Sequence, residues 1–127
     1  MSVNNQELQH TIAKEVSYSG IGLHSGKDVL MTLKPAEANT GVTFIRTDLP
    51  GNPEIRALAE NVSSTVKATT LSENGAEVFT VEHLMAAISL SGVDNIRIEM
   101  SSPEPPVTDG SAKVFCELLE EAGIVEQ

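Results

Sequence analysis

The sequence is poor in cysteine. Cys116 is the single cysteine among 127 residues. One cysteine cannot form an internal disulfide, and it also excludes metal and redox sites of the CxxC type. A reducing compartment is therefore favoured.

Basic residues are also scarce. Eight Lys and Arg stand singly along the chain against 18 Asp and Glu, which gives a formal net charge of -10. A surface that binds nucleic acid needs clustered cations to contact the phosphates. The sequence therefore argues against nucleic acid as a partner.

Long hydrophobic runs are missing as well. No apolar run approaches the ~20 residues of a membrane-spanning helix, and the segment before Val16 has no apolar core of a secretory signal. We therefore expect a cytoplasmic protein without a transmembrane segment. A lipid-linked substrate is still compatible with the lack of a membrane-spanning helix, because an enzyme can take an acylated molecule from a membrane surface without inserting a helix.

The remaining composition is that of an ordinary globular protein. Apolar residues make up 40% of the chain and charged residues 20%. A chain of this length buries roughly two thirds of its unfolded surface, which is enough for an unaided core. We expect residues 1–127 to form one domain.

The first half of the sequence predicts strands separated by turns. Expected strands cover 11–18, 29–33 and 42–46, with weaker candidates at 54–57 and 68–71. Turns or loops are expected at 19–22, 25–28, 35–41 and 49–53. Asn74-Gly75 suits a tight hairpin turn, which would pair 69–71 with 77–79.

The second half predicts two helices. Apolar residues recur at helical spacing over 81–91, with Thr80 as a suitable N-cap and Gly92 just past the end. Residues 95–100 alternate as a strand, 101–110 hold three prolines and predict a loop, and 111–122 form a second amphipathic helix that Gly123 ends. This order indicates an α+β domain, a two-layer sandwich of one mostly antiparallel sheet with both helices on one face.

Glu82 and His83 are the most informative pair, because they place an acid/base group and a metal ligand on the first turn of a rigid helix. The alternative is a favourable first-turn charge beside a solvated imidazole. A catalytic zinc normally uses three protein ligands, whereas the chain has three histidines in all and no two lie one helical turn apart. If His83 binds zinc, the other ligands must come from His24, scattered carboxylates or another polypeptide segment. His10 lies near the chain end and is expected to be inert.

Two further segments are candidates. His24 lies in the glycine-rich stretch 20–26, where glycine allows close approach of a ligand or of another strand, although a simple structural turn is the favoured explanation. The proline-rich loop 103–111 carries Asp109 and Ser111, which either support a site or cap the next helix. Ser111 lacks the GxSxG pattern of a serine hydrolase.

Six ordered motifs together resemble a known family. They are 20–26 (GIGLHSG), 39–41 (NTG), 46–48 (RTD), 80–84 (TVEHL), 94–96 (DNI) and 109–112 (DGSA). In number and order they are similar to the motifs of the UDP-3-O-acyl-N-acetylglucosamine deacetylases, often called LpxC. The resemblance extends from about Thr11 to Ile124.

The resemblance implies a zinc-dependent amide hydrolase that deacetylates a UDP-linked acylated amino sugar on the way to lipid A. It also implies a fold like domain 2 of ribosomal protein S5. It places Glu82 at the family's general base and His83 at one zinc ligand. More loosely, it places Val66, Lys67, Ala68 and Thr69 beside the acyl passage. His24 and Asp109 are candidate supporting residues on the grounds given above.

The family has two related α+β domains that enclose the active site. The resemblance assigns the remaining zinc ligands, a catalytic His and a Lys to a second, carboxy-terminal domain that this sequence does not contain. We therefore expect this chain to be the amino-terminal half and to be inactive alone. The alternative is a stand-alone domain of the same fold that binds a ligand or a protein without catalysis.

Overall fold

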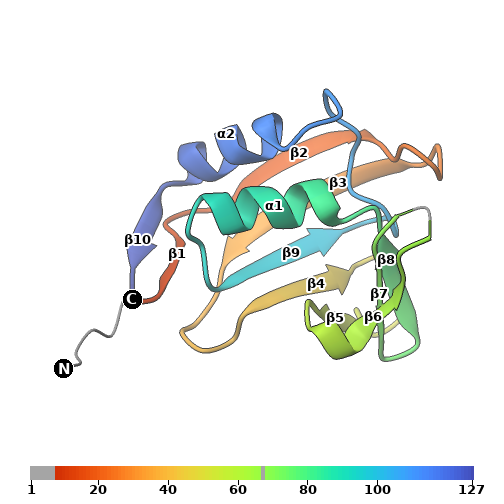
Figure 1. The fold of residues 1–127 in the computed structure, drawn as a ribbon, viewed down its shortest axis with the longest axis horizontal. Helices are drawn as coiled ribbons and strands as arrows, with labels where there is room; N and C mark the ends of the chain where they lie inside the picture. Colours follow the sequence, from red (N-terminus) through yellow and green to blue (C-terminus); the bar gives the residue numbers. More distant parts are fainter. Residues whose placement is uncertain (1–7, 67) are drawn as a thin grey trace.

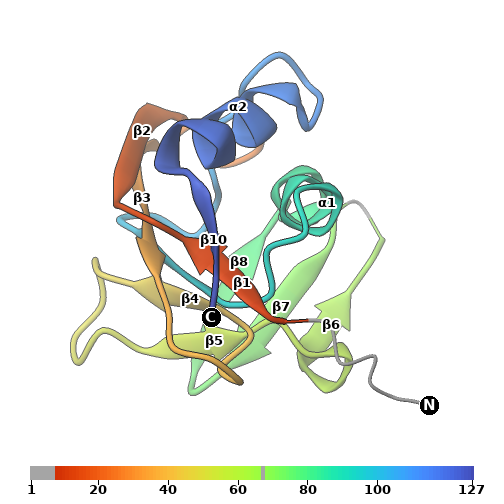
Figure 2. The ribbon, with the colours of Figure 1, turned by 90° about the vertical axis from the view of Figure 1, so that its left-hand side faces the viewer.

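The computed structural model describes residues 8–66 and 68–127 and has a five-stranded sheet at its centre (Figure 1). The strand order is β2-β3-β9-β4-β5, and only the β4–β9 pair is parallel. The strands are β2 (Val16–Ile21), β3 (Asp28–Pro35), β4 (Val42–Arg46), β5 (Glu54–Arg56) and β9 (Ile96–Met100). Two helices, α1 (Glu82–Leu90) and α2 (Lys113–Ala122), pack against each other on one side of this sheet (Figure 2). The predicted α+β fold is confirmed.

The core lies between the helices and the sheet. Alternate residues of the central strands point to it, because side chains of a strand alternate between its two faces. The strands contribute Val29, Met31, Leu33, Phe44, Ile96, Ile98 and Met100, and the helices contribute Leu84, Ile88, Phe115 and Leu119. These residues are nearly all fully buried, so apolar burial stabilises the layered arrangement.

Two smaller sheets accompany the main one, where the sequence predicts a single sheet. Strands β6 (Val62–Ser64), β7 (Thr70–Glu73) and β8 (Ala76–Phe79) form a three-stranded sheet after a 3-10 turn, η1 (Ala59–Asn61). Strand β1 (His10–Ile12) pairs with β10 (Ile124–Glu126). The predicted β7–β8 hairpin is confirmed, and its turn residues Asn74 and Gly75 have φ angles of 56° and 76°.

The predicted turn at 19–22 is wrong. Strand β2 continues through Ile21, because Ser19, Gly20 and Ile21 pair with β3. The chain reverses instead between Gly22 and Lys27, where Gly22 N donates to Lys27 O at 3.0 Å. The glycine-rich stretch is therefore half strand and half turn.

The predicted helix caps differ at the two ends. Thr80 is not the N-cap of α1, since Val81 occupies that position without a side-chain cap bond. Ala112, rather than Asp109 or Ser111, precedes α2. The C-terminal predictions are confirmed, because Gly92 and Gly123 follow the helices with φ angles of 74° and 80°.

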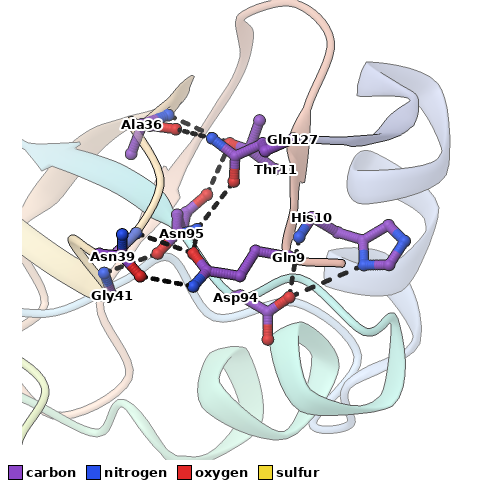
Figure 3. A network of polar contacts seen from close by, with 9 residues as sticks. All are labelled: Gln9, His10, Thr11, Ala36, Asn39, Gly41, Asp94, Asn95 and Gln127. Atoms are coloured by element: carbon purple, nitrogen blue, oxygen red, sulfur yellow. Dashed lines mark hydrogen bonds and ion pairs between the residues drawn. The ribbon is translucent and has the colours of Figure 1, made fainter. Parts of the chain in front are cut away.

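A polar network around the buried Asn95 joins the two ends of the described chain (Figure 3). Asn95, only 2% exposed, donates from Nδ2 to Gln9 Oε1 and to Gln127 Oε1 at 2.7 Å each. Its Oδ1 accepts a bond from Gly41 N at 2.8 Å. Gln127 in turn donates to Ala36 O at 2.7 Å. The network gives the motifs 39–41 and 94–96 a structural role.

Candidate functional site

Glu82 and His83 begin helix α1, next to a residue with an unusual backbone. Thr80 has a φ of 58°, which is uncommon for any residue except glycine and is an outlier for a β-branched one. Such conformations cost about 1–3 kcal/mol and persist only where the surroundings impose them. The direction in which α1 presents its first turn thus depends on what holds Thr80.

The two side chains of the first turn have different surroundings. Glu82 is half-buried, and its Oε1 accepts a bond from Thr69 N at 3.3 Å. His83 is exposed and borders a small pocket of about 50 Å³ between α1 and the proline-rich loop, with Leu23 and Phe115 in its walls. A carboxylate held at one side and an accessible imidazole at the other are therefore adjacent on one helical turn.

His24 lies in the turn between β2 and β3 and borders a larger pocket of about 530 Å³. The other lining residues are Ser64, Val66, Ala68, Thr70 and Phe79. The structure thus brings His24 to the segment that the sequence predicts as substrate-binding. Val66 is 88% exposed there, and Thr69 contacts Glu82 as above, whereas Lys67 lies outside the described residues.

Glu104, which the sequence analysis did not single out, connects these parts. Its side chain is fully buried. Oε1 accepts bonds from the backbone N of His24 and of Ser25, both at 2.9 Å. Oε2 accepts a bond from the Thr80 hydroxyl at 2.6 Å and lies 2.9 Å from His24 Nδ1. One carboxylate therefore holds together the β2–β3 turn and Thr80, which lies two residues before α1.

Burial raises the pKa of Glu104, but bonds from the Thr80 hydroxyl, Ser25 N and His24 outweigh it and lower that pKa below its ordinary value. The carboxylate is thus ionised and can only accept hydrogen bonds. The signal in the sequence is an acid between prolines, Pro103 and Pro105, facing a glycine-rich turn. Neither feature alone separates this residue from an ordinary loop charge.

The glycines of the stretch 20–26 allow the proline-rich loop to approach. A Cβ at Gly22 would lie 2.5 Å from Glu104 Oε1 and closer still to Ser25 Oγ. A Cβ at Gly20 would lie 2.8 Å from Pro106 Cβ. Of the two predicted uses of these glycines, the close approach of another segment of the chain is confirmed. At Gly20 and Gly22 that space is filled by the chain itself.

Asp109 is bound within its own loop. Its Oδ1 accepts bonds from Ser111 Oγ at 2.7 Å and Ser111 N at 3.0 Å. The Ser111 hydroxyl and then its N–H lower the pKa of Asp109. Ser111 borders the small pocket beside His83, so Asp109 shapes the wall of this pocket through Ser111.

The described residues, 8–66 and 68–127, contain no group of three or more His, Cys, Asp or Glu that could hold a metal ion. His83 can therefore supply one ligand of a metal site but not its full set. His10 lies elsewhere, with Nδ1 3.7 Å from Asp94 Oδ2 in the network of Figure 3. Nor does this part of the chain contain a helix long and apolar enough to cross a membrane.

Comparison with known proteins relates the whole described domain to one family. The family described as LpxC, UDP-3-O-acyl N-acetylglycosamine deacetylase, matches residues 9–127. A UDP-3-O-acyl-N-acetylglucosamine deacetylase of Thermosynechococcus vestitus is 51% identical over 94% of this chain and 42% of its own length. One from Myxococcus xanthus is 50% identical over 94% of this chain and 38% of its own length. A bifunctional enzyme LpxC/FabZ of Chlorobaculum tepidum is 48% identical, and the match covers 94% of this chain and 26% of that protein. The chain thus spans about two fifths of the first two relatives.

Proposed function

The chain belongs to the LpxC family of UDP-3-O-acyl N-acetylglycosamine deacetylases, and from this premise we propose that it is the amino-terminal half of a zinc-dependent deacetylase. The substrate would be UDP-3-O-acyl-N-acetylglucosamine, and the reaction would serve lipid A biosynthesis. The observation that carries this proposal is the adjacency of Glu82 and His83 on the first turn of α1, with His83 exposed and Glu82 held by Thr69.

His83 fits the role of a zinc ligand, because an exposed imidazole on a rigid element offers a nitrogen that zinc prefers. Zinc, when bound, supplies a Lewis acid that polarises the amide carbonyl of the substrate. The remaining ligands would come from the part of the enzyme beyond this chain, since the described residues contain no complete set.

Glu82 fits the role of general base. Its carboxylate lies beside the proposed ligand and would accept a proton from the attacking water. The bond from Thr69 N occupies Oε1 and orients the group, and among residues 8–66 and 68–127 no other hydrogen bond competes for the proton-accepting lone pairs of Oε2. Hydrolysis then releases acetate and leaves a free amine on the sugar.

The substrate would extend toward the pocket bordered by His24, Val66 and Ala68. An exposed valine beside an alanine suits an acyl chain, and Lys67 with Thr69 completes the proposed contact segment. The hydrogen bond from Thr69 N to the Glu82 carboxylate joins this segment to the reacting group. Substrate binding and chemistry would thus share one end of the domain.

A second candidate is a non-catalytic domain of the same fold that binds a ligand or a protein. The absence of a complete metal cluster from the described residues favours it. The pocket beside His24 would then be the binding site, and Glu82 would serve only as a favourable charge at the helix start.

Acetate release separates the two candidates. Residues 1–127 are joined to the carboxy-terminal part of the Thermosynechococcus relative, and the fusion is assayed on the UDP-linked substrate with and without zinc. We expect zinc-dependent turnover by the fusion and none by residues 1–127 alone. A folded fusion that binds zinc but releases no acetate would contradict the deacetylase. Turnover by residues 1–127 alone, abolished by a chelator, would contradict the need for a second half.

A further inference from the structure

Glu104 is a fully buried carboxylate whose two oxygens accept hydrogen bonds from several groups. Four donors converge on its two oxygens from two segments, the β2–β3 turn and Thr80. Burying an ionised carboxylate is costly unless every lone pair has a partner. An apolar side chain would fill the same space without that cost, so the carboxylate serves the groups that it binds.

The first of these groups is the imidazole of His24. An ionised carboxylate only accepts hydrogen bonds, and Glu104 Oε2 lies 2.9 Å from Nδ1. The proton of the neutral ring therefore resides on Nδ1, and Nε2 carries the lone pair. The ring is 46% exposed and borders the pocket that contains Val66 and Ala68. An imidazole ring that borders the pocket thus carries a hydrogen-bond acceptor.

The second group is Thr80. Its hydroxyl donates to the same Oε2 at 2.6 Å, and its backbone has the left-handed φ of 58°. The main chain next to it is also held, because Phe79 N donates to Pro103 O at 2.9 Å. The segment 103–104 therefore fixes both the end of β8 and Thr80, two residues before the start of α1.

We propose that Glu104 is a positioning residue with two roles. It keeps His24, at the edge of the substrate pocket, in the Nδ1–H tautomer, and it holds Thr80 so that the first turn of α1 places Glu82 and His83 in the active site. The expected effect on activity rests on the proposed function. The tautomer of His24 is independent of that function, because the contacts within the described chain determine it.

The first test leaves Glu104 unchanged and uses a substitution only to assign the signals. The imidazole nitrogens of His24 are observed by ¹⁵N NMR in the fusion enzyme, in alkaline buffer where the ring is neutral, and assigned by their loss in His24→Ala. We expect the Nδ1–H tautomer. An Nε2–H ring in the parent protein would overturn the proposal at once.

The second test is Glu104→Gln, which keeps the size of the side chain. Its Oε1 can still accept from His24 N and Ser25 N, but its NH₂ now faces Nδ1 and forces the ring to accept there. We expect the Nε2–H tautomer, unchanged zinc content, and activity lower by roughly 10- to 100-fold, as found for partners that orient active-site groups. Glu73→Gln is the matched control, because Glu73 of β7 is also a carboxylate that accepts hydrogen bonds from several donors. It should leave the tautomer and the turnover of the folded enzyme unchanged.

A double-mutant cycle separates positioning from mere stability. In a His24→Ala background, Glu104→Gln should lower kcat/KM by a markedly smaller factor than in the parent, because the imidazole it orients is gone. An equal factor in both backgrounds would show that Glu104 does not act through His24.

If Glu104→Gln does not fold, Thr80→Ser and Thr80→Val replace it. Serine keeps the hydroxyl donor and should retain activity, whereas valine lacks the donor and should lower activity. Equal activity of these two variants would contradict the role assigned to Thr80. A parent fusion without activity would contradict the proposed function and leave the tautomer test valid.

Discussion

Arg46 donates from Nη1 to the main-chain oxygen of Glu77 at 2.8 Å, so that a buried cation of β4 holds strand β8. The same guanidinium binds Asp48 through two parallel bonds of 2.8 and 2.7 Å, and the side-chain bond from Arg46 lowers the pKa of Asp48 despite partial burial. Strand β8 leads directly into α1, which carries Glu82 and His83. This contact therefore fixes the β6-β7-β8 sheet, and with it the start of α1, against the main sheet.

Arg46→Lys should destabilise the fold by about 1–3 kcal/mol, because an ammonium group cannot form the parallel pair and reach Glu77 as well. Urea unfolding at neutral pH measures this. Arg97→Lys is the control, since Arg97 forms an exposed pair with Glu54 at 3.2 Å and should change stability by less than about 1 kcal/mol. Equal losses in the two variants would contradict the structural role of Arg46.

Glu82→Gln and His83→Ala should fail differently in the fusion enzyme. Without its proposed general base, Glu82→Gln should keep its zinc and lose roughly 10²–10⁴-fold in the chemical step. His83→Ala should lose zinc affinity, because water does not replace a ligand nitrogen at equal strength. Metal analysis beside single-turnover rates distinguishes them. Near-normal turnover in Glu82→Gln, or parent-like zinc affinity in His83→Ala, would show that the pair is only a helix start.

Asn95→Ala should destabilise the domain by about 2–3 kcal/mol, because it leaves Gly41 N and two glutamine oxygens without their buried partner. Asn61→Ala is the control. Asn61 donates to Arg56 O in an exposed setting and to Glu73 Oε1 at 3.2 Å in a partly buried one. Because water can replace the exposed bond and Asn61 is not fully buried, the change should be smaller. The comparison is made by urea denaturation, and a similar loss at both positions would argue against a special role for the network.

Stability should fall in acid partly through Glu73. Bonds from the guanidinium and then the N–H of Arg56 lower the pKa of Glu73 from 4.5 to about 2. A carboxyl whose folded pKa is depressed stabilises the fold above its unfolded pKa, and this contribution disappears as pH falls from about 4.5 to about 2. The difference in urea midpoint between the parent and Glu73→Gln should therefore be largest near neutral pH and shrink toward pH 2. Arg56→Gln should remove the same part of the pH dependence, and a difference that stays constant with pH would contradict the ion pair.

Strong local patterns predicted much of the fold. The apolar run of β3, the strand pattern of β4, the alternation of β9, the Asn74-Gly75 turn and the glycines after both helices all appear where the sequence indicates. Strand β10 was missed, because its three residues are exposed and its pairing with β1 depends on contacts more than 100 positions apart. Such a strand has no local signature.

The site was predictable only in its helical part. Glu82 and His83 follow from residue type and helical position, and their roles stay predictions. Thr80 was predicted as an N-cap because its hydroxyl suits that position, but this hydroxyl donates its hydrogen bond to Glu104 instead. Glu104 itself depends on a contact 80 residues away with His24, which no spacing within the sequence reveals.

The pairing of β1 with β10 brings the two ends of the described part of the chain, residues 8–66 and 68–127, close together. Gln127 N donates to Gln9 O at 2.8 Å, at the opposite end of the molecule from the start of α1 (Figure 1). A short peptide linking these positions would close a loop whose ends already meet, at little entropic cost in the folded state. A circularly permuted domain, opened at the exposed Asn74-Gly75 turn, would therefore keep every strand pairing while leaving the Glu82-His83 end intact.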